Sequence, residues 1–312
     1  MTNRRNFFKQ ATALAMGGLL LGKTESLSAA TKAVNASTGK KNIGLQIYSL
    51  FDELYDNLPE RLKQLRKMGY TNIELAGYSP DGKIHGVPIM EFKKYVDDAD
   101  LVIKSTHVQP GVWEYTNSNK SQIMGYWKKT AEDHAKMGVK LLVQPGLPAT
   151  RSIEEVKQVC DVFNEVGEYI KSNGMKFGYH NHDMEFARVK SGGNGAVLQF
   201  RSNDPKIYDL FLENTDPDLV FFEMDCYWTV IGQNDPVEYL QKHPTRIQAL
   251  HVKDRHVLGK SGFMNFEAIF NQANENGITN FFVELEGMPQ GKTQMEGVEE
   301  CAKYLLKSKF VK

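Results

Sequence analysis

The stretch KFGYHNHDMEF, residues 176–186, places the densest group of reactive side chains directly after a short apolar run. The run Phe177–Tyr179 has the character of a buried strand. The polar residues that follow it are His180, Asn181, His182, Asp183 and Glu185. Imidazoles and carboxylates grouped in this way are ligands for divalent ions such as zinc, manganese or cobalt. A polar loop would have the same composition, so this stretch by itself leaves the choice between a loop and a site open.

The same unit, an apolar strand followed by a polar loop and an amphipathic helix, repeats from Asn42 onward. We predict eight strands, at 43–48, 72–75, 101–106, 140–144, 176–179, 219–224, 247–251 and 280–285. Apolar residues at helical spacing predict helices that include 58–70, 121–139, 152–174 and 265–277. Strands that are apolar throughout are typical of parallel sheets buried on both faces. The sequence therefore predicts a single-domain α/β fold over 42–312, a closed (β/α)8 TIM barrel.

An open, doubly wound sheet is the competing α/β fold, and the loops argue against it. No Gly-rich dinucleotide fingerprint follows the first strand. The fragment GGNG at 192–195 lies in a polar loop with no helix behind it, so we interpret it as a turn. We expect the surrounding stretch, 187–202, to form an extra hairpin after the fifth strand, where insertions shape the mouth of a barrel.

The N-terminus has the features of an export signal. Arg4 and Arg5 precede a short apolar run at 11–22, and small residues follow at 28–30. The run is too short for a permanent anchor, and the paired arginines resemble the twin-arginine type. We predict a cleavable signal peptide over 1–30, a linker over 31–41 and a periplasmic mature protein with no stable membrane anchor after cleavage. An uncleaved N-terminal tether is the alternative.

The composition excludes several partners. Lysine plus arginine equals aspartate plus glutamate at 38 each, so no net field draws the protein to nucleic acid or anionic lipid. The three cysteines, Cys160, Cys226 and Cys301, show neither metal-knuckle spacing nor a disulfide framework. A small molecule is the expected partner. Barrels with exposed helices often pair, which leaves a homo-oligomer open.

Polar and ionisable side chains gather where the predicted strands end. In barrels of this kind the active site is built at the carboxyl face of the strands. The candidates that the strand ends deliver there are Gln46, Glu74, His107, Gln144, His180, His182, Asp225, Trp228, His251, Lys253, Glu284 and Glu286. A carboxylate such as Asp225, between Phe221–Phe222 and Cys226, needs a cation or several donors. We therefore place the site on this face.

Four motifs now show a resemblance to a known family, the xylose-isomerase-like barrels of the sugar phosphate isomerase/epimerase type. They are YHNH (179–182), EMDCYW (223–228), LHVKDR (250–255) and VELEG (283–287), and the resemblance covers about residues 42–310. It implies one divalent ion, manganese, zinc, cobalt or magnesium. The family holds this ion with a carboxylate after strand five, an aspartate after strand six, a histidine after strand seven and a glutamate after strand eight. The last three correspond to Asp225, His251 and Glu284.

The chain departs from the family at two positions. Many relatives carry Glu-Asn-His after strand five, whereas this chain has His180-Asn181-His182, which makes His180 the expected ligand and His182 the alternative. The fifth- and eighth-strand glutamates are also the proton-transfer pair of the epimerases, so a symmetric exchange between two glutamates is in doubt and elimination gains weight. The second departure is Trp228, where many relatives have a histidine and where an indole offers a stacking face for a sugar ring.

The remaining residues receive roles around this ion. Glu284, Glu286, Lys253 and His182 are the expected catalytic residues, with Lys253 either stabilising an oxyanion or pairing with a nearby carboxylate. Glu284 and Glu286 are two apart in a strand and so face the same side of the sheet. The side chains expected to bind substrate are His107, Glu74, Gln46, Gln144, Trp228 and Trp113.

The expected function is that of a divalent-metal-dependent isomerase or epimerase. It would abstract a proton next to the carbonyl of an unphosphorylated sugar or keto-sugar through a metal-stabilised enediolate. No Gly-rich phosphate loop follows strands seven or eight, which argues against a sugar phosphate. The alternatives are a lyase that cleaves 3-keto-glycosides by elimination on the same site and a non-catalytic sugar-binding barrel. A phosphodiesterase that acts on DNA would need more metal ligands and a basic groove, which the balanced charge disfavours.

Overall fold

The computed structural model describes residues 41–193, 202–287 and 291–312, and the described elements belong to one compact unit, Gly39–Lys312. The predicted signal (1–30) and all but the last residue of the predicted linker (31–41) lie outside the described residues. Within the described ranges, no helix has the length and apolar character needed to cross a membrane.

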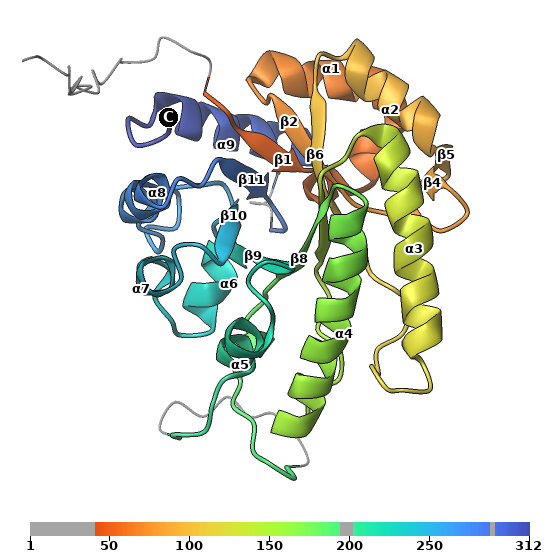
Figure 1. Cartoon of the computed structure of the whole chain (residues 1–312). Helices are drawn as coiled ribbons and strands as arrows, with labels where there is room; N and C mark the ends of the chain where they lie inside the picture. The colour runs from red at the N-terminus through yellow and green to blue at the C-terminus, as the bar shows by residue number, and fades with distance from the viewer. Residues whose placement is uncertain (1–40, 194–201, 288–290) are drawn as a thin grey trace, which may run out of the picture. The chain divides into compact units, whose positions relative to one another are not determined.

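All eight predicted strands are present, and they close into a parallel barrel (Figure 1). In chain order they are β1 (Gly44–Gln46), β2 (Asn72–Leu75), β6 (Val102–His107), β7 (Leu141–Gln144), β8 (Lys176–His180), β9 (Val220–Asp225), β10 (Ile247–Lys253) and β11 (Asn280–Glu284). Strand β1 pairs in parallel with both β2 and β11, which closes the ring and confirms the predicted fold. The first strand is shorter than predicted because Gln46 caps a 3-10 helix, η1 (Ile47–Asn57), through the backbone N–H of Tyr48.

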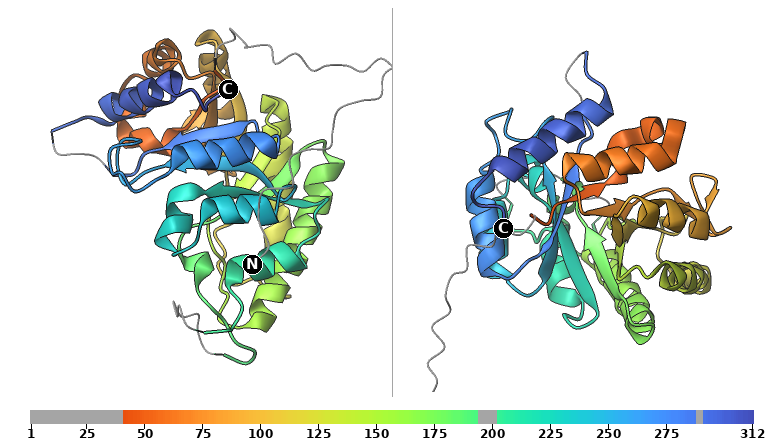
Figure 2. Two further views of the ribbon diagram at one scale, coloured as in Figure 1. Left: turned by 90° about the vertical axis from the view of Figure 1, so that its left-hand side faces the viewer. Right: turned by 90° about the horizontal axis from the view of Figure 1, so that it is seen from above.

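The helices form an outer layer around the strands, as the view along the barrel in Figure 2 shows. They are α1 (Leu58–Met68), α2 (Ile89–Asp98), α3 (Lys120–Met137), α4 (Ile153–Ser172), α5 (Ile207–Asn214), α6 (Cys226–Ile231), α7 (Pro236–Lys242), α8 (Phe266–Glu275) and α9 (Gln294–Lys307). The four predicted helices correspond to α1, α3, α4 and α8, and each was predicted to end two residues too late. The predicted ends include the residues that turn the chain back toward the next strand.

Two additions interrupt the repeat. After β2, a small antiparallel sheet of β3 (Tyr78–Ser79), β4 (Lys83–Ile84) and β5 (Val87–Pro88) was not predicted, because strands this short leave no periodicity to detect. After β8 comes the 3-10 helix η2 (Met184–Phe186). An antiparallel bridge joins Arg188 to Lys206 at the predicted hairpin, whose interior, 194–201, lies outside the described residues.

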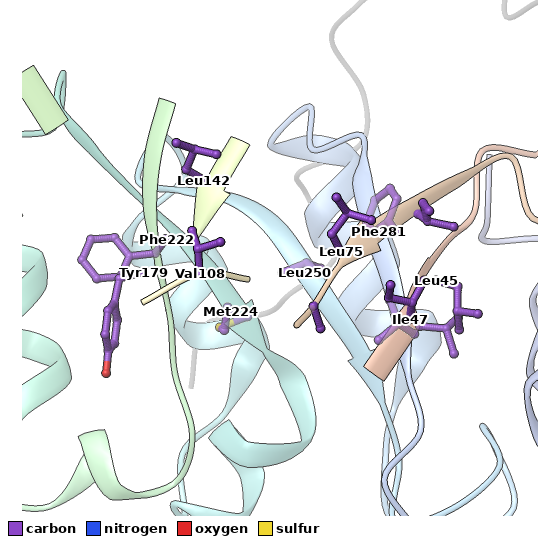
Figure 3. Packing of buried hydrophobic residues seen from close by; sticks show 14 of the residues in the cluster. Leu45, Ile47, Leu75, Val108, Leu142, Tyr179, Phe222, Met224, Leu250 and Phe281 are labelled. Atoms are coloured by element: carbon purple, nitrogen blue, oxygen red, sulfur yellow. The ribbon is translucent and has the colours of Figure 1, made fainter. Parts of the chain in front are cut away.

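Residues alternate along each strand between the helix layer and the barrel interior. Leu142, Phe222 and Leu250 belong to the large apolar core between strands and helices (Figure 3). Their chain neighbours Val143, Phe221 and Ala249 form a separate cluster with Phe282 inside the barrel. This alternation lets one set of strands bury an apolar core outside the barrel and deliver a different set of side chains within it.

Two aromatic rings close the amino end of the barrel, and two glycines make room for them. A Cβ on Gly178 would lie 2.5 Å from Cζ of Phe221, and a Cβ on Gly44 would lie 2.6 Å from Cδ1 of Phe282. Real Cβ atoms do not approach this closely, so the rings occupy the space that side chains at these positions would need. The interior at this end is thus mostly apolar, with Asn72 as a polar member beside Gly44, and the charged residues lie at the other end.

Candidate metal centre and active site

The barrel interior becomes charged next to the aromatic rings, toward the carboxyl ends of the strands. Strand β9 places Glu223 and Asp225 on the same side as Phe221, and β10 places His251 and Lys253 on the same side as Ala249. These four side chains are buried at the carboxyl end of the barrel. Charged groups in such a position must be paired or bind a cation.

Four predicted ligands meet here: His180, Asp225, His251 and Glu284. They come from the adjacent strands β8 to β11, and one ligand atom from each lies within 4.8 Å of the others. His180 Nε2 is 3.6 Å from Asp225 Oδ2, and His251 Nδ1 is 3.1 Å from Glu284 Oε2. We call these four residues the ligand group.

The donor atoms of the ligand group fit a divalent ion. Both ring nitrogens of His180 and Oδ2 of Asp225 are buried without a hydrogen-bond partner, a costly arrangement for a protein interior. Burial, reinforced by the neighbouring His251 and His107, lowers the pKa of His180 well below its ordinary value. The ring is therefore neutral, as a ligand must be. Two imidazoles and two carboxylates suit zinc, manganese, cobalt or a similar ion.

A second cluster lies against the first: Glu74, His107, Glu223 and His251. His251 Nε2 is 2.6 Å from Glu74 Oε2, and His107 Nε2 is 2.8 Å from Glu223 Oε2. The two imidazole rings stack at 4.9 Å with their planes 12° apart. We call these four residues the support group, because each imidazole is paired with a carboxylate of the group through Oε2, whereas Oε1 of Glu74 and of Glu223 has no hydrogen-bond partner.

His251 belongs to both groups and uses a different nitrogen in each. With an ion bound, a proton on Nε2 donated to Glu74 would leave the lone pair of Nδ1 for the ligand group. A carboxylate behind a ligating histidine fixes the tautomer and ring orientation in many metal sites. Gln46 contributes to the same arrangement by donating from Nε2 to Glu74 Oε2 at 2.9 Å.

The pKa values show an excess of carboxylates in this interior. Burial would lower the pKa of His251, but Glu223, Glu284 and Glu74 outweigh burial and raise it well above its ordinary value. Burial raises the pKa of Asp225 to about 6, although Lys253 and His251 act against it. The shift of His251 reflects the surrounding carboxylates, whereas that of Asp225 reflects burial, a cost that a bound cation would offset.

Lys253 joins the ligand group to Glu286. Its Nζ is 2.7 Å from Glu286 Oε2, 3.0 Å from Glu284 Oε2 and 3.8 Å from Asp225 Oδ2. Burial lowers the pKa of Lys253, but the carboxylates outweigh it and raise the pKa above its ordinary value, so the side chain stays charged. The ammonium group also lies 4.8 Å from the ring centroid of Trp228, which gives the indole a cation–π contact.

A cavity of about 420 Å³ opens onto the ligand group. His182 and Glu286 line it beside His180 and Glu284. Burial lowers the pKa of His182, so its ring is neutral near pH 7 and can accept a proton. Glu286 remains 33% exposed. The cavity therefore has two groups able to transfer protons that are not members of the ligand group.

The remaining predicted residues are distributed between the cavity and its surroundings. His107 lines the cavity, whereas Glu74 is fully buried within the support group. The amide of Gln144 accepts from Tyr115 and donates to the backbone carbonyl of Gly146, so both of its ends are engaged within the protein. Trp113 is 57% exposed beside Gly146. The indole N–H of Trp228 is buried without a partner.

Glu223 is the site residue that the sequence analysis missed. It precedes Asp225 by two residues, so the period of a strand already put both carboxylates on one face. The pairing of Glu223 with His107 could not be predicted, because the two residues are 116 positions apart in the chain.

The family follows from a comparison with known proteins. A family model described as "Xylose isomerase-like TIM barrel" matches residues 62–307, which include most of the barrel and all four residues of the ligand group. The chain belongs to this family. This xylose isomerase-like barrel is 52% identical to a sugar phosphate isomerase/epimerase from Parabacteroides distasonis, with a TM-score of 0.83 over 87% of this chain and 100% of that one.

More distant relatives share the fold with different activities. A 3-keto-D-glucoside 4-epimerase from E. coli is 18% identical, with a TM-score of 0.63 over 86% of this chain and 99% of that one. An inosose dehydratase from Clostridium perfringens is 26% identical over 176 residues, 49% of this chain and 54% of the dehydratase. The chain thus spans about half the length of the curated relatives it matches. Its relatives include epimerases and dehydratases.

Proposed function

We propose that this barrel is a divalent-metal-dependent isomerase or epimerase of an unphosphorylated sugar or keto-sugar. The observation that carries the proposal is the ligand group itself, in which His180 and Asp225 hold buried, unpaired donor atoms at the edge of a cavity. An ion held by His180, Asp225, His251 and Glu284 would stabilise the negative charge that develops on two neighbouring oxygens of the sugar.

Protein residues then move the proton. His182, a neutral imidazole in the cavity wall, removes the proton from the carbon beside the carbonyl. Glu286 exchanges a proton from the other end of the site, where the ammonium group of Lys253 holds its carboxylate at 2.7 Å. Lys253 also places a fixed positive charge beside the reacting oxygens, which favours an oxyanion.

The cavity favours a substrate without a phosphate. None of the described residues that line it is a lysine or an arginine, the side chains that usually hold phosphate oxygens. Its charged members near the ligand group include Glu284 and Glu286, which would repel a phosphate. Action after export, as the N-terminal sequence predicts, is part of this proposal.

Elimination is the second candidate, and it is favoured by the asymmetry of the site. The two proton-transfer groups proposed here differ in kind, since His182 is an imidazole and Glu286 a carboxylate, and both line the cavity. Such a pair suits a reaction in which one group removes the proton beside the carbonyl and the other protonates a departing oxygen. The similarity to inosose dehydratases supports this alternative. Its substrates would be 3-keto-glycosides, which would lose their aglycone.

Turnover in D₂O distinguishes isomerisation or epimerisation from elimination. The metal-loaded protein is incubated with free ketoses and with 3-keto-glucosides, and the products are followed by proton NMR. Deuterium in a rearranged sugar that keeps its substituents is the expected result, and release of the aglycone would establish elimination instead. Sugar binding with neither exchange nor release would overturn the enzyme proposal and leave a sugar-binding barrel. Asp225→Asn, nearly isosteric with the wild type, is the control that should abolish exchange.

A further inference from the structure

The cavity beside the ligand group has two chemically different ends. Its titratable lining, His107, His180, His182, Glu284 and Glu286, comes from β6, β8 and β11. The other end is lined by Tyr48, Ala76, Gly77, Tyr78, Val108 and Tyr126. We call these six residues the tyrosine end. It contains no group that is charged near neutral pH, and the proposed proton transfers do not use it.

The topology puts one part of the tyrosine end across the barrel from Asp225 and leaves Tyr48 nearer to Glu284. Ala76, Gly77 and Tyr78 follow β2, and in the closed strand order β2 lies directly opposite β9, which carries Asp225. Tyr48 directly follows β1, which pairs with both β2 and β11, so it stands between this segment and the strand of Glu284. The cavity extends past the reacting ring over a neutral surface of aromatic faces and very small side chains.

The aromatic rings of this end are held in place by the protein. The hydroxyl of Tyr78 donates to Asp133 Oδ2 at 2.9 Å, and Asp133 is itself paired with Lys129 and Lys136. Tyr48 is 48% exposed, and its ring packs against that of Phe51, with 4.9 Å between the ring centroids.

The backbone of Phe51 is strained in a way that points to binding. Its φ of 45° and ψ of −134° lie where an L-residue is rarely found, at a typical cost of about 1–3 kcal/mol. Strain of this kind is retained mostly at ligand sites and switches. Here it keeps an aromatic pair, Tyr48 and Phe51, partly open to solvent at the end of β1. A protein gains nothing in stability from exposed aromatic rings on a strained loop.

We propose that the tyrosine end binds a second, uncharged ring attached to the reacting sugar. The substrate class is then a keto-glycoside whose aglycone stacks on Tyr48, and a free ketose fills only part of the cavity. Aromatic faces and a neutral lining recognise a sugar or aryl ring through stacking and apolar contact. The inference rests on the proposed function for the position of the reacting sugar.

Binding of two ligands that differ only in the aglycone tests the subsite. Dissociation constants of methyl and phenyl 3-keto-β-glucoside are measured by calorimetry for the metal-free protein, which keeps turnover out of the measurement. We expect the wild type to bind the phenyl compound roughly ten-fold more tightly, the gain of one well-placed ring contact. Tyr48→Ala should remove this preference and leave the affinity for the methyl compound within about two-fold.

A matched variant separates the subsite from a general effect. Phe263→Ala truncates an aromatic side chain that is similarly exposed, at 54%, but does not line this cavity, and it should keep the phenyl preference. Equal affinities in the wild type, or an equal loss for both ligands in Tyr48→Ala, would overturn the inference. Failure of the proposed function would appear differently, as absence of exchange and release in D₂O while the phenyl preference persists.

Discussion

The ligand group and the support group are built from the same residue types, yet they differ in how their imidazoles are paired. In the support group, Glu74 and Glu223 are paired with imidazoles at 2.6 and 2.8 Å. In the ligand group, both nitrogens of His180 and one oxygen of Asp225 have no hydrogen-bond partner. A histidine–carboxylate cluster is therefore not a binding site by composition alone. Each group has carboxylate oxygens without a hydrogen-bond partner, Oε1 of Glu74 and Glu223 in the support group and Oδ2 of Asp225 in the ligand group. The unpaired imidazole of His180 is therefore what distinguishes the ligand group.

His251 belongs to both groups, and this determines how strongly changes in each group should affect ion binding. Its Nε2 faces Glu74 and its Nδ1 faces Glu284. Changes in the ligand group should therefore abolish ion binding, and changes in the support group should weaken it. Changes to buried carboxylates elsewhere should leave it intact.

The largest effect is expected from Asp225→Ala, which removes a proposed ligand with an unpaired oxygen. An ion at 100 times its Kd stabilises a protein by about 2.7 kcal/mol. We expect added Mn²⁺ or Zn²⁺ to raise the melting temperature of the wild type and to leave that of Asp225→Ala unchanged. Loss of the folded state in the variant would instead make Asp225 a structural residue, and circular dichroism distinguishes the two outcomes.

An intermediate effect is expected from Glu74→Gln, which keeps the shape of the side chain but weakens its hold on His251. Loss of a carboxylate behind a ligating histidine typically lowers metal affinity about 10–100-fold. Competition with a chromophoric chelator measures this Kd without reference to turnover. An unchanged Kd in a folded variant would contradict the role assigned to the support group.

Glu185→Gln should leave ion binding unchanged and alter only stability. Glu185 is buried outside both groups, where it accepts from the Tyr179 hydroxyl at 2.5 Å and from the His182 N–H at 2.8 Å. Burial raises its pKa from 4.5 to about 7 despite these hydrogen bonds. The variant is thus the matched control for Glu74→Gln.

The direction in which pH changes the stability follows from the raised pKa of Glu185. A carboxyl group whose pKa is raised by folding stabilises most when protonated, below its unfolded pKa, and this contribution is lost as the pH rises through 7. Over that window the wild type should lose about 3 kcal/mol of unfolding free energy relative to Glu185→Gln. Urea titrations at pH 5, 6, 7 and 8 measure the difference. Parallel pH profiles would show that Glu185 does not titrate in this range.

The fold was readable from the sequence because each of its signals is local. Each strand is a short apolar run, and the ligands follow such runs at the ends of β8 to β11, as at His180 and Asp225. The closed barrel then brings these ends together without further information. Knowing the strands was therefore enough to predict that polar strand ends would gather, and the resemblance to the family then singled out four ligands among them.

The details that were not predicted depend on pairing across the barrel. Whether Glu74 faces a substrate or His251 is decided by a contact between residues 177 positions apart. Gln144 ends a strand as predicted, but Tyr115 from a distant loop occupies its carbonyl oxygen. The strained turn at Phe51 has no sequence signal, since glycine rather than phenylalanine is usual at positive φ.

Elemental analysis of the purified protein, with Asp225→Ala and Glu74→Gln beside it, tests the difference between the two groups most directly. We predict about one divalent transition-metal ion per chain in the wild type, none in Asp225→Ala, and about one in Glu74→Gln when the ion is supplied in excess. Two ions per wild-type chain, with one lost in Glu74→Gln, would show that the support group binds metal as well. No ion in the wild type after reloading would contradict the metal centre itself.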